Sequence, residues 1–150
     1  MKLPAWTPNA NGQFVKSPKI FLNDKGLLCS LTNEGENLLS HRTQAGHLLE
    51  NFIAMEITKQ ISWHPYPLKL MHFSKHKGAA VDLVIEDHKK QLYGIEVKSK
   101  ASLKQDDFEG LSALSKLAGK RLKRGIVLYS GTEAISGFGQ KLNAIPINNL

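Results

Sequence analysis

The chain has 150 residues, the size of one average domain, and its 41% hydrophobic and 22% charged residues argue against disorder, collagen-like repeats and coiled coil. We find no membrane span and no signal peptide, and the single cysteine, Cys29, excludes an intrachain disulfide and a multi-thiolate zinc site, so we expect a cytoplasmic protein away from membranes. A formal net charge of +7 favours an anionic partner, nucleic acid first.

Residues 1–35 differ in composition from the rest of the chain. Prolines interrupt short apolar runs, which predict strands at Phe14-Val15 and Ile20-Phe21-Leu22, and Asp24 is a candidate cap for a short helix ending at Leu31. This stretch has too little apolar content to fold alone. We therefore treat residues 1–35 as an N-terminal extension, resting on the domain of residues 36–150 or on a missing segment.

The stretch Glu34–Ile61 has apolar residues at three- and four-residue spacing, which predicts a helix with a break near Arg42–Gly46. The prolines at 65 and 67 end it. On a helical projection, Glu50 lies at the border of the apolar face, whereas Glu56 points into its middle.

Short apolar runs then predict three strands, at Leu68–Phe73, Ala80–Glu86 and Leu92–Ser99, joined by polar hairpin connections. An amphipathic helix follows at Asp106–Ala118, with Gly119 as its stop and a stripe formed by Phe108, Leu111, Leu114 and Leu117. Two further strands are predicted at Gly125–Ser130 and Leu142–Ile147. The order predicts a hairpin meander and a helical crossover to a parallel strand.

Two acidic residues meet on neighbouring strands of this meander. A five-residue turn at Asp87–Gln91 pairs Glu86 with Leu92, and the register then sets Asp82 across from Glu96 on one sheet face. Facing carboxylates repel unless a cation lies between them. Lys98, two residues on, supplies part of that charge, and Mg²⁺ or Mn²⁺ supplies it more completely.

Such a site suits phosphodiester chemistry. The metal lowers the pKa of a bound water and neutralises a phosphate, while Lys98 orients the water or stabilises the developing charge. A basic surface would hold the DNA backbone. Its principal candidates are Lys100 and the cluster Lys120, Arg121, Lys123 and Arg124, which we expect beside the active edge.

These residues resemble the PD-(D/E)XK motif of restriction-endonuclease-like nucleases. The resemblance implies a restriction-endonuclease-like core, an α/β fold in αβββαβ order with a central mixed β-sheet flanked by helices. It also assigns metal binding to Asp82, Glu96 and Glu50, and catalysis to these three with Lys98. More narrowly, the chain is similar to the C-terminal domain of unknown function of predicted AAA+ ATPases. The matching stretches are Leu3–Trp6, Lys16–Phe21, Asp24–Leu27, Gly46–Glu50, Ala80–Val84, Gly94–Lys98 and Gly125–Tyr129.

Two departures from that family matter. Ala80 stands where members commonly carry an acidic residue, and no P-loop motif occurs, so we expect this chain to bind no ATP. Residues 1–35 would then be a remnant of the segment that links to the missing ATPase and winged-helix parts. That segment is a candidate surface for a protein partner or a homodimer.

Several alternatives stay open. The chain is either a Mg²⁺- or Mn²⁺-dependent DNA endonuclease-like domain or an inactive module of the same fold for DNA binding or protein assembly. Glu56 is the rival of Glu50 if the helix is rotated, and His72 and His76 are a weak zinc pair. Three aromatic residues are base-stacking candidates, with packing as the commoner role: Trp6, Trp63 and Tyr66.

Overall fold

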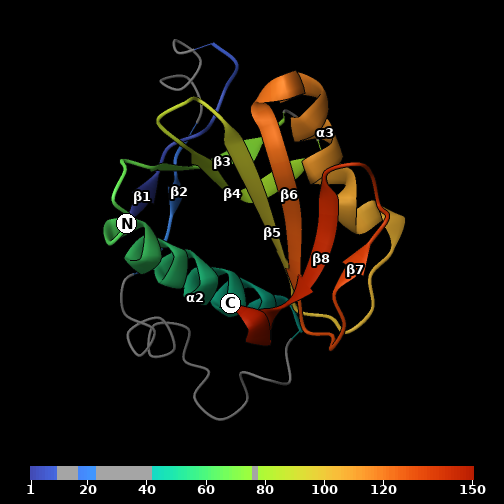
Figure 1. The fold of residues 1–150 in the computed structure, drawn as a ribbon. Coiled ribbons are helices and arrows are strands. Elements are labelled where there is room, and N and C mark those ends of the chain that lie inside the picture. Colours follow the sequence, from blue (N-terminus) through green and yellow to red (C-terminus); the bar gives the residue numbers. More distant parts are fainter. Residues whose placement is uncertain (10–16, 23–41, 76–77) are drawn as a thin grey trace.

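A computed structural model describes residues 1–9, 17–22, 42–75 and 78–150, with the first helix's side chains described from residue 45. Within these ranges the predicted αβββαβ order is confirmed (Figure 1). Its elements are α2 (Arg42–Ser62), β3 (Lys69–Ser74), β4 (Ala80–Glu86), β5 (Leu92–Lys98), α3 (Glu109–Ala118), β6 (Leu122–Tyr129) and β8 (Leu142–Pro146). The expected strand at Phe14-Val15, the helix from Asp24 and residues 34–41 lie outside the described residues.

The strands from β3 onward form a six-stranded mixed sheet in the order β3-β4-β5-β6-β8-β7, where β7 (Ile135–Ser136) is a short edge strand. The meander β3-β4-β5 is antiparallel, and β6 lies parallel to β5 after the crossover through α3. This confirms the predicted α/β fold with a mixed sheet. The sequence missed β7 and the parallel pairing of β8 with β6.

Helices cover both faces of the sheet. On one face Ile53 and Ile57 of α2 pack with Leu83 and Ile95, and on the other Leu111 and Leu114 of α3 belong to a second core group. That second group takes in Val81, Val84 and Val127 from the sheet. A Cβ on Gly94 would lie 2.7 Å from Cδ2 of Leu111, so glycine at this position lets α3 approach β5 closely.

Both helices end where the sequence indicates. α2 stops at Ser62, ahead of Pro65, and α3 stops at Gly119, whose φ of 58° favours glycine. The start of the second helix is a 3-10 turn, Gln105–Phe108, ahead of α3. The predicted stripe was wrong at Leu117, which is 47% exposed, because it lies about 120° around the helix from Leu111.

The described N-terminal residues join the core of the domain. Strands β1 (Lys2–Leu3) and β2 (Lys19–Ile20) pair with each other, and the backbone N–H of Trp6 donates to His72 O of β3 at 2.6 Å. Leu3 and Phe21 are buried on the α2 face, whereas Trp6 is buried in the α3-face group. The expectation that this segment leans on the main domain is thus met by its described parts. Among the described residues, no helix has the length and apolar character needed to cross a membrane.

Candidate active site

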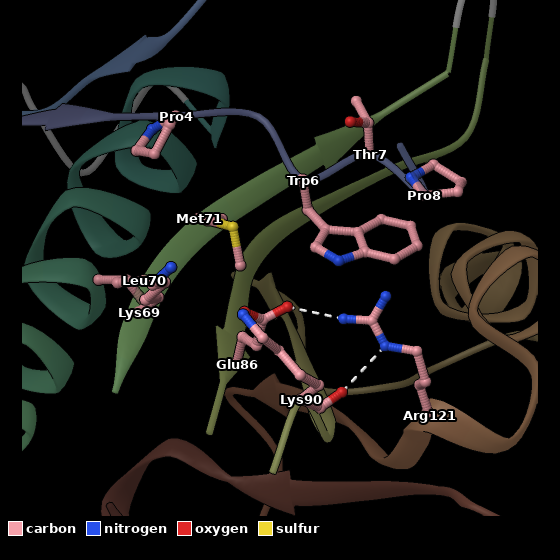
Figure 2. Close-up of a pocket in the computed structure, with 10 residues that line it drawn as sticks. All are labelled: Pro4, Trp6, Thr7, Pro8, Lys69, Leu70, Met71, Glu86, Lys90 and Arg121. Carbon is pink, nitrogen blue, oxygen red and sulfur yellow. Dashed lines mark hydrogen bonds and ion pairs between the residues drawn. The ribbon is translucent and has the colours of Figure 1, made fainter. Parts of the chain in front are cut away.

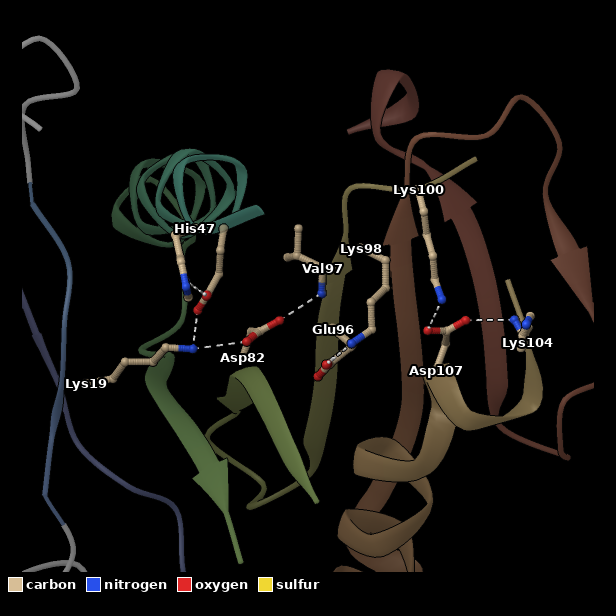
Figure 3. Close-up of polar contacts among 10 residues, drawn as sticks. Lys19, His47, Asp82, Glu96, Val97, Lys98, Lys100, Lys104 and Asp107 are labelled. Atoms are coloured by element: carbon tan, nitrogen blue, oxygen red, sulfur yellow. Dashed lines mark hydrogen bonds and ion pairs between the residues drawn. The ribbon is translucent and has the colours of Figure 1, made fainter. Parts of the chain in front are cut away.

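An open pocket of about 870 Å³ lies at the end of β5, next to the first turns of α2. Its lining includes all four predicted catalytic residues: Glu50 from α2, Asp82 from β4, and Glu96 and Lys98 from β5. Figure 3 shows Glu96 paired with Lys98, and Asp82 reaching toward the backbone of Val97. The structure therefore places these four residues, from three elements, at one pocket.

Asp82 lies at an irregularity of the sheet. The pairing of β4 with β5 has the predicted register, but its last pair is Leu83 with Ile95. The register of β3 with β4 shifts beside the same place, and Val81 and Val84, three residues apart, pack in one core group. Strict alternation, on which the shared face of Asp82 and Glu96 was predicted, therefore fails here.

The carboxylate of Asp82 is consequently turned toward the α2 side of the pocket. Its Oδ2 accepts a hydrogen bond from the backbone N–H of Val97 at 2.9 Å, and its Oδ1 accepts one from Lys19 Nζ at 3.0 Å. Glu96 instead shares with Gly94 the sheet face that packs against α3. The two carboxylates still interact through their charges.

Glu96 is buried, with 9% of its surface exposed, and only half of its carboxylate is paired. Oε1 accepts a hydrogen bond from Lys98 Nζ at 2.8 Å, whereas Oε2 has no hydrogen-bond partner in the described part of the chain. Burial and the charge of Asp82 raise the pKa of Glu96 to about 7, against the opposing effect of Lys98. Burial works against the charge of Lys98, but Glu96, Asp82 and Asp107 outweigh it and raise the pKa of its ammonium.

A residue that the sequence did not single out joins the pocket residues. Lys19 of β2 reaches Asp82 (Figure 3), and its ammonium also forms an ion pair with Oε1 of Glu50. Burial, followed by the charge of Asp82, raises the pKa of Glu50. Lys19 lies in one of the stretches that carry the family resemblance, which was the available signal.

A second missed residue, Asp107, organises the loop after β5. It is 9% exposed, and it accepts hydrogen bonds from the backbone N–H of Lys104 at 2.7 Å and pairs with Nζ of Lys100 at 2.6 Å. Burial alone would raise the pKa of Asp107, but these bonds outweigh it and lower that pKa. Lys100, a predicted DNA contact, is thereby fixed at the pocket.

The basic cluster of residues 120–124 lies elsewhere, so the prediction that it flanks the active edge is wrong. β5 and β6 are parallel, with Leu92 beside Leu122 and Lys98 beside Tyr129. The start of β6 therefore lies at the far end of the sheet, roughly 20 Å from Lys98 at the ordinary rise per strand residue. Arg121 donates there to Oε2 of Glu86 at 2.7 Å, in a separate pocket of about 700 Å³ (Figure 2).

Other candidates do not join the pocket. Glu56 pairs with Lys59 at 2.6 Å, so Glu50 is the helix acid that faces the site. His72 is buried in contact with Ser17 O, Trp6 is in the core, and His76 and Cys29 lie outside the described residues. Trp63 and Tyr66 are exposed. Among the described side chains, no three of His, Cys, Asp or Glu are grouped closely enough to hold a metal ion.

One protein-family model matches most of the chain. A family model described as "Domain of unknown function (DUF4143)" matches residues 45–150, which include Glu50, Asp82, Glu96 and Lys98 but not Lys19. The comparison with curated proteins found no match, and neither did the comparison with solved structures. Because the matched range is well over half of the chain, the protein belongs to the DUF4143 family of domains of unknown function.

Proposed function

We propose that this pocket binds Mg²⁺ or Mn²⁺ and hydrolyses phosphodiester bonds of DNA, in a core of the PD-(D/E)XK type. The observation that carries the proposal is the meeting of three acidic side chains and Lys98 in one open pocket. A concave site with convergent polar groups and a strongly perturbed carboxyl pKa is the usual setting of catalysis.

The donor set of this pocket fits a hard divalent cation. Asp82, Glu96 and Glu50 offer only carboxylate oxygens, the ligands that Mg²⁺ and Mn²⁺ prefer. Oε2 of Glu96 is buried and has no partner among the described residues, so it is free to serve as a ligand. A cation held between Glu50 and Asp82 would supply Lewis-acid polarisation of the phosphate and an activated water.

In this proposal Lys98 stabilises the negative charge that develops on the phosphate. Its ammonium stays protonated at neutral pH because neighbouring carboxylates raise its pKa, and Glu96 Oε1 orients it at 2.8 Å. Its side chain is 30% exposed, so it can face a substrate in the pocket. Lys100, held by Asp107, adds a cation for the DNA backbone at the same edge.

One observation favours the second candidate, an inactive module of the same fold that binds DNA or assembles with a protein. Lys19 already neutralises Glu50 and Asp82, and the described acidic residues are not gathered as a three-ligand group. A pocket whose charges are balanced from within does not need a metal ion for stability.

Nicking of supercoiled DNA in Mn²⁺ or Mg²⁺ separates the two functions. We expect Asp82→Asn and Lys98→Met each to lower the cleavage rate by about 10²–10³. DNA binding in Ca²⁺ should be largely unchanged in both, because contacts elsewhere on the backbone supply the affinity. Lys59→Met, which also removes one lysine and one ion pair, is the matched control and should cleave like the wild type.

The outcome for the wild-type protein decides between the functions. If no form of DNA is cleaved with either metal, and neither metal raises the melting temperature, the nuclease proposal is wrong. DNA binding without cleavage would then support the module.

A further inference from the structure

Lys19 links the N-terminal segment to the pocket. Its Nζ lies 3.0 Å from Oδ1 of Asp82 and also pairs with Oε1 of Glu50, so that β2, α2 and β4 meet at one ammonium group. We propose that Lys19 is a built-in competitor of the divalent cation: its ammonium occupies the position between Glu50 and Asp82, and a metal ion has to displace it. This inference rests on the proposed metal site and adds its regulation.

The two carboxylates need a cation in that position. Their side chains are only 13% and 16% exposed, and buried like charges repel each other strongly. An ammonium group and a hard metal ion satisfy the same oxygens, and two cations cannot share this position without repelling each other. Occupation by Lys19 and by the metal therefore exclude each other.

The side chain of Lys19 can leave without unfolding its strand. It is 35% exposed, so solvent is close to the ammonium. The backbone of the segment is held by other contacts: Phe21 N–H donates to Met1 O at 2.9 Å, and Leu22 exchanges two hydrogen bonds of 2.9 Å with the side chain of Asn51. Asp82 also keeps its bond from Val97 N–H.

Lys19 thus differs in role from Lys98. Lys98 pairs with Oε1 of Glu96 and leaves Oε2 free, whereas Lys19 takes up oxygens of both other acids. Lys19 also lies outside residues 45–150, the range that the family model matches, so control of the site comes from a segment ahead of that range.

Calorimetric titration of the full chain with Mn²⁺ alone tests the competition. We expect Lys19→Met to bind Mn²⁺ about tenfold more tightly than the wild type, because the competing charge is gone. Lys19→Arg keeps a cation and should remain within about twofold of the wild type. The matched control is Lys59→Met, which removes the ion pair with Glu56 and should also leave the affinity unchanged. Adding Asp82→Asn to Lys19→Met should abolish the tight binding.

Each outcome of the titration bears on a different claim. Equal or weaker Mn²⁺ binding by Lys19→Met overturns the competition, and the metal site itself survives if binding still depends on Asp82. Absence of Mn²⁺ binding by every variant overturns the metal site and the competition together. Tighter binding that persists in the double variant places the metal elsewhere and also overturns the inference.

A measurement on the wild type covers the case in which Lys19→Met does not fold. Nuclear magnetic resonance of the lysine ammonium groups, assigned with Lys19→Arg, follows Lys19 Nζ directly during titration with Mg²⁺. We expect the Lys19 signal to move to the position of a solvent-exposed lysine while the Lys59 signal is unchanged. A Lys19 signal that stays in place at saturating Mg²⁺ contradicts displacement.

Discussion

Two buried carboxylates at opposite ends of the same hairpin differ in how many of their oxygens are paired. Glu86 on β4 is 8% exposed and Glu96 on β5 is 9% exposed. Both oxygens of Glu86 are paired, Oε1 with Lys90 at 3.0 Å and Oε2 with Arg121 at 2.7 Å (Figure 2). Glu96 has one paired oxygen and one with no partner in the described residues (Figure 3).

This difference separates a carboxylate with both oxygens paired from one with an unpaired oxygen. Arg121 also donates to the backbone carbonyl of Lys90 and lies 5.8 Å from the ring of Trp6, so Glu86 ties the hairpin turn to the start of β6 and to the N-terminal segment. Its hydrogen-bonding capacity is used within the protein. Glu96 lines the pocket, and its buried Oε2 has no hydrogen-bond partner among the described residues, so part of its hydrogen-bonding capacity is unused.

The largest expected effect on stability comes from the pH dependence of Glu96. Without metal, the folded protein keeps a proton on Glu96 up to about pH 7, whereas the unfolded chain releases it near 4.5. Stability therefore falls as the pH rises through this window, by about 3 kcal/mol. Glu96→Gln mimics the protonated side chain and should remove most of the fall, leaving a remainder from the raised pKa of Glu50.

Urea unfolding at pH 5 and pH 8 in the presence of a chelator measures this dependence. If the wild type and Glu96→Gln lose the same free energy of unfolding between pH 5 and pH 8, the proton on Glu96 is not the cause of the pH dependence.

A smaller effect on stability is expected from breaking the ion pair of Glu86. Arg121→Met should lower the free energy of unfolding by about 1 kcal/mol, because it leaves Oε2 of Glu86 unpaired while Lys90 and partial exposure limit the loss. Mn²⁺ binding and DNA cleavage should be unchanged. Urea unfolding beside the cleavage assay checks both. If Arg121→Met has normal stability but loses cleavage, the ion pair of Glu86 serves function and not stability, which contradicts the role given to it here.

The smallest effect concerns DNA affinity. Lys100→Ser should reduce the slope of log affinity against log salt by about one phosphate contact, since Lys100 is held at the pocket. The paired substitutions Lys123→Ser and Arg124→Ser lie at the far end of β6 and should leave the slope unchanged. A larger decrease from the second pair would place the DNA along the start of β6.

Much of the fold was predictable because residues close together in the sequence determine its turns and strand register. The turn at residues 87–91 closes on itself, with Asp87 Oδ1 accepting from the backbone N–H groups of Lys89 and Gln91. This turn fixes Glu86 opposite Leu92 and the rest of the register with it. Glu96 and Lys98 were found for the same reason: they are two residues apart on one strand.

The sequence by itself determined the order of the helices and strands and the register of the central hairpin, because periodicity and turn chemistry act over a few residues. It also singled out four of the charged residues that line the pocket, Glu50 among them through the family resemblance. Only the tertiary structure decided that Asp82 turns toward Val97 and that Arg121 points away from the pocket. It alone brought Lys19 to Asp82 across 63 residues of sequence. Such contacts depend on how β2, α2 and β4 pack together, and no local pattern encodes a distance between segments so far apart in the chain.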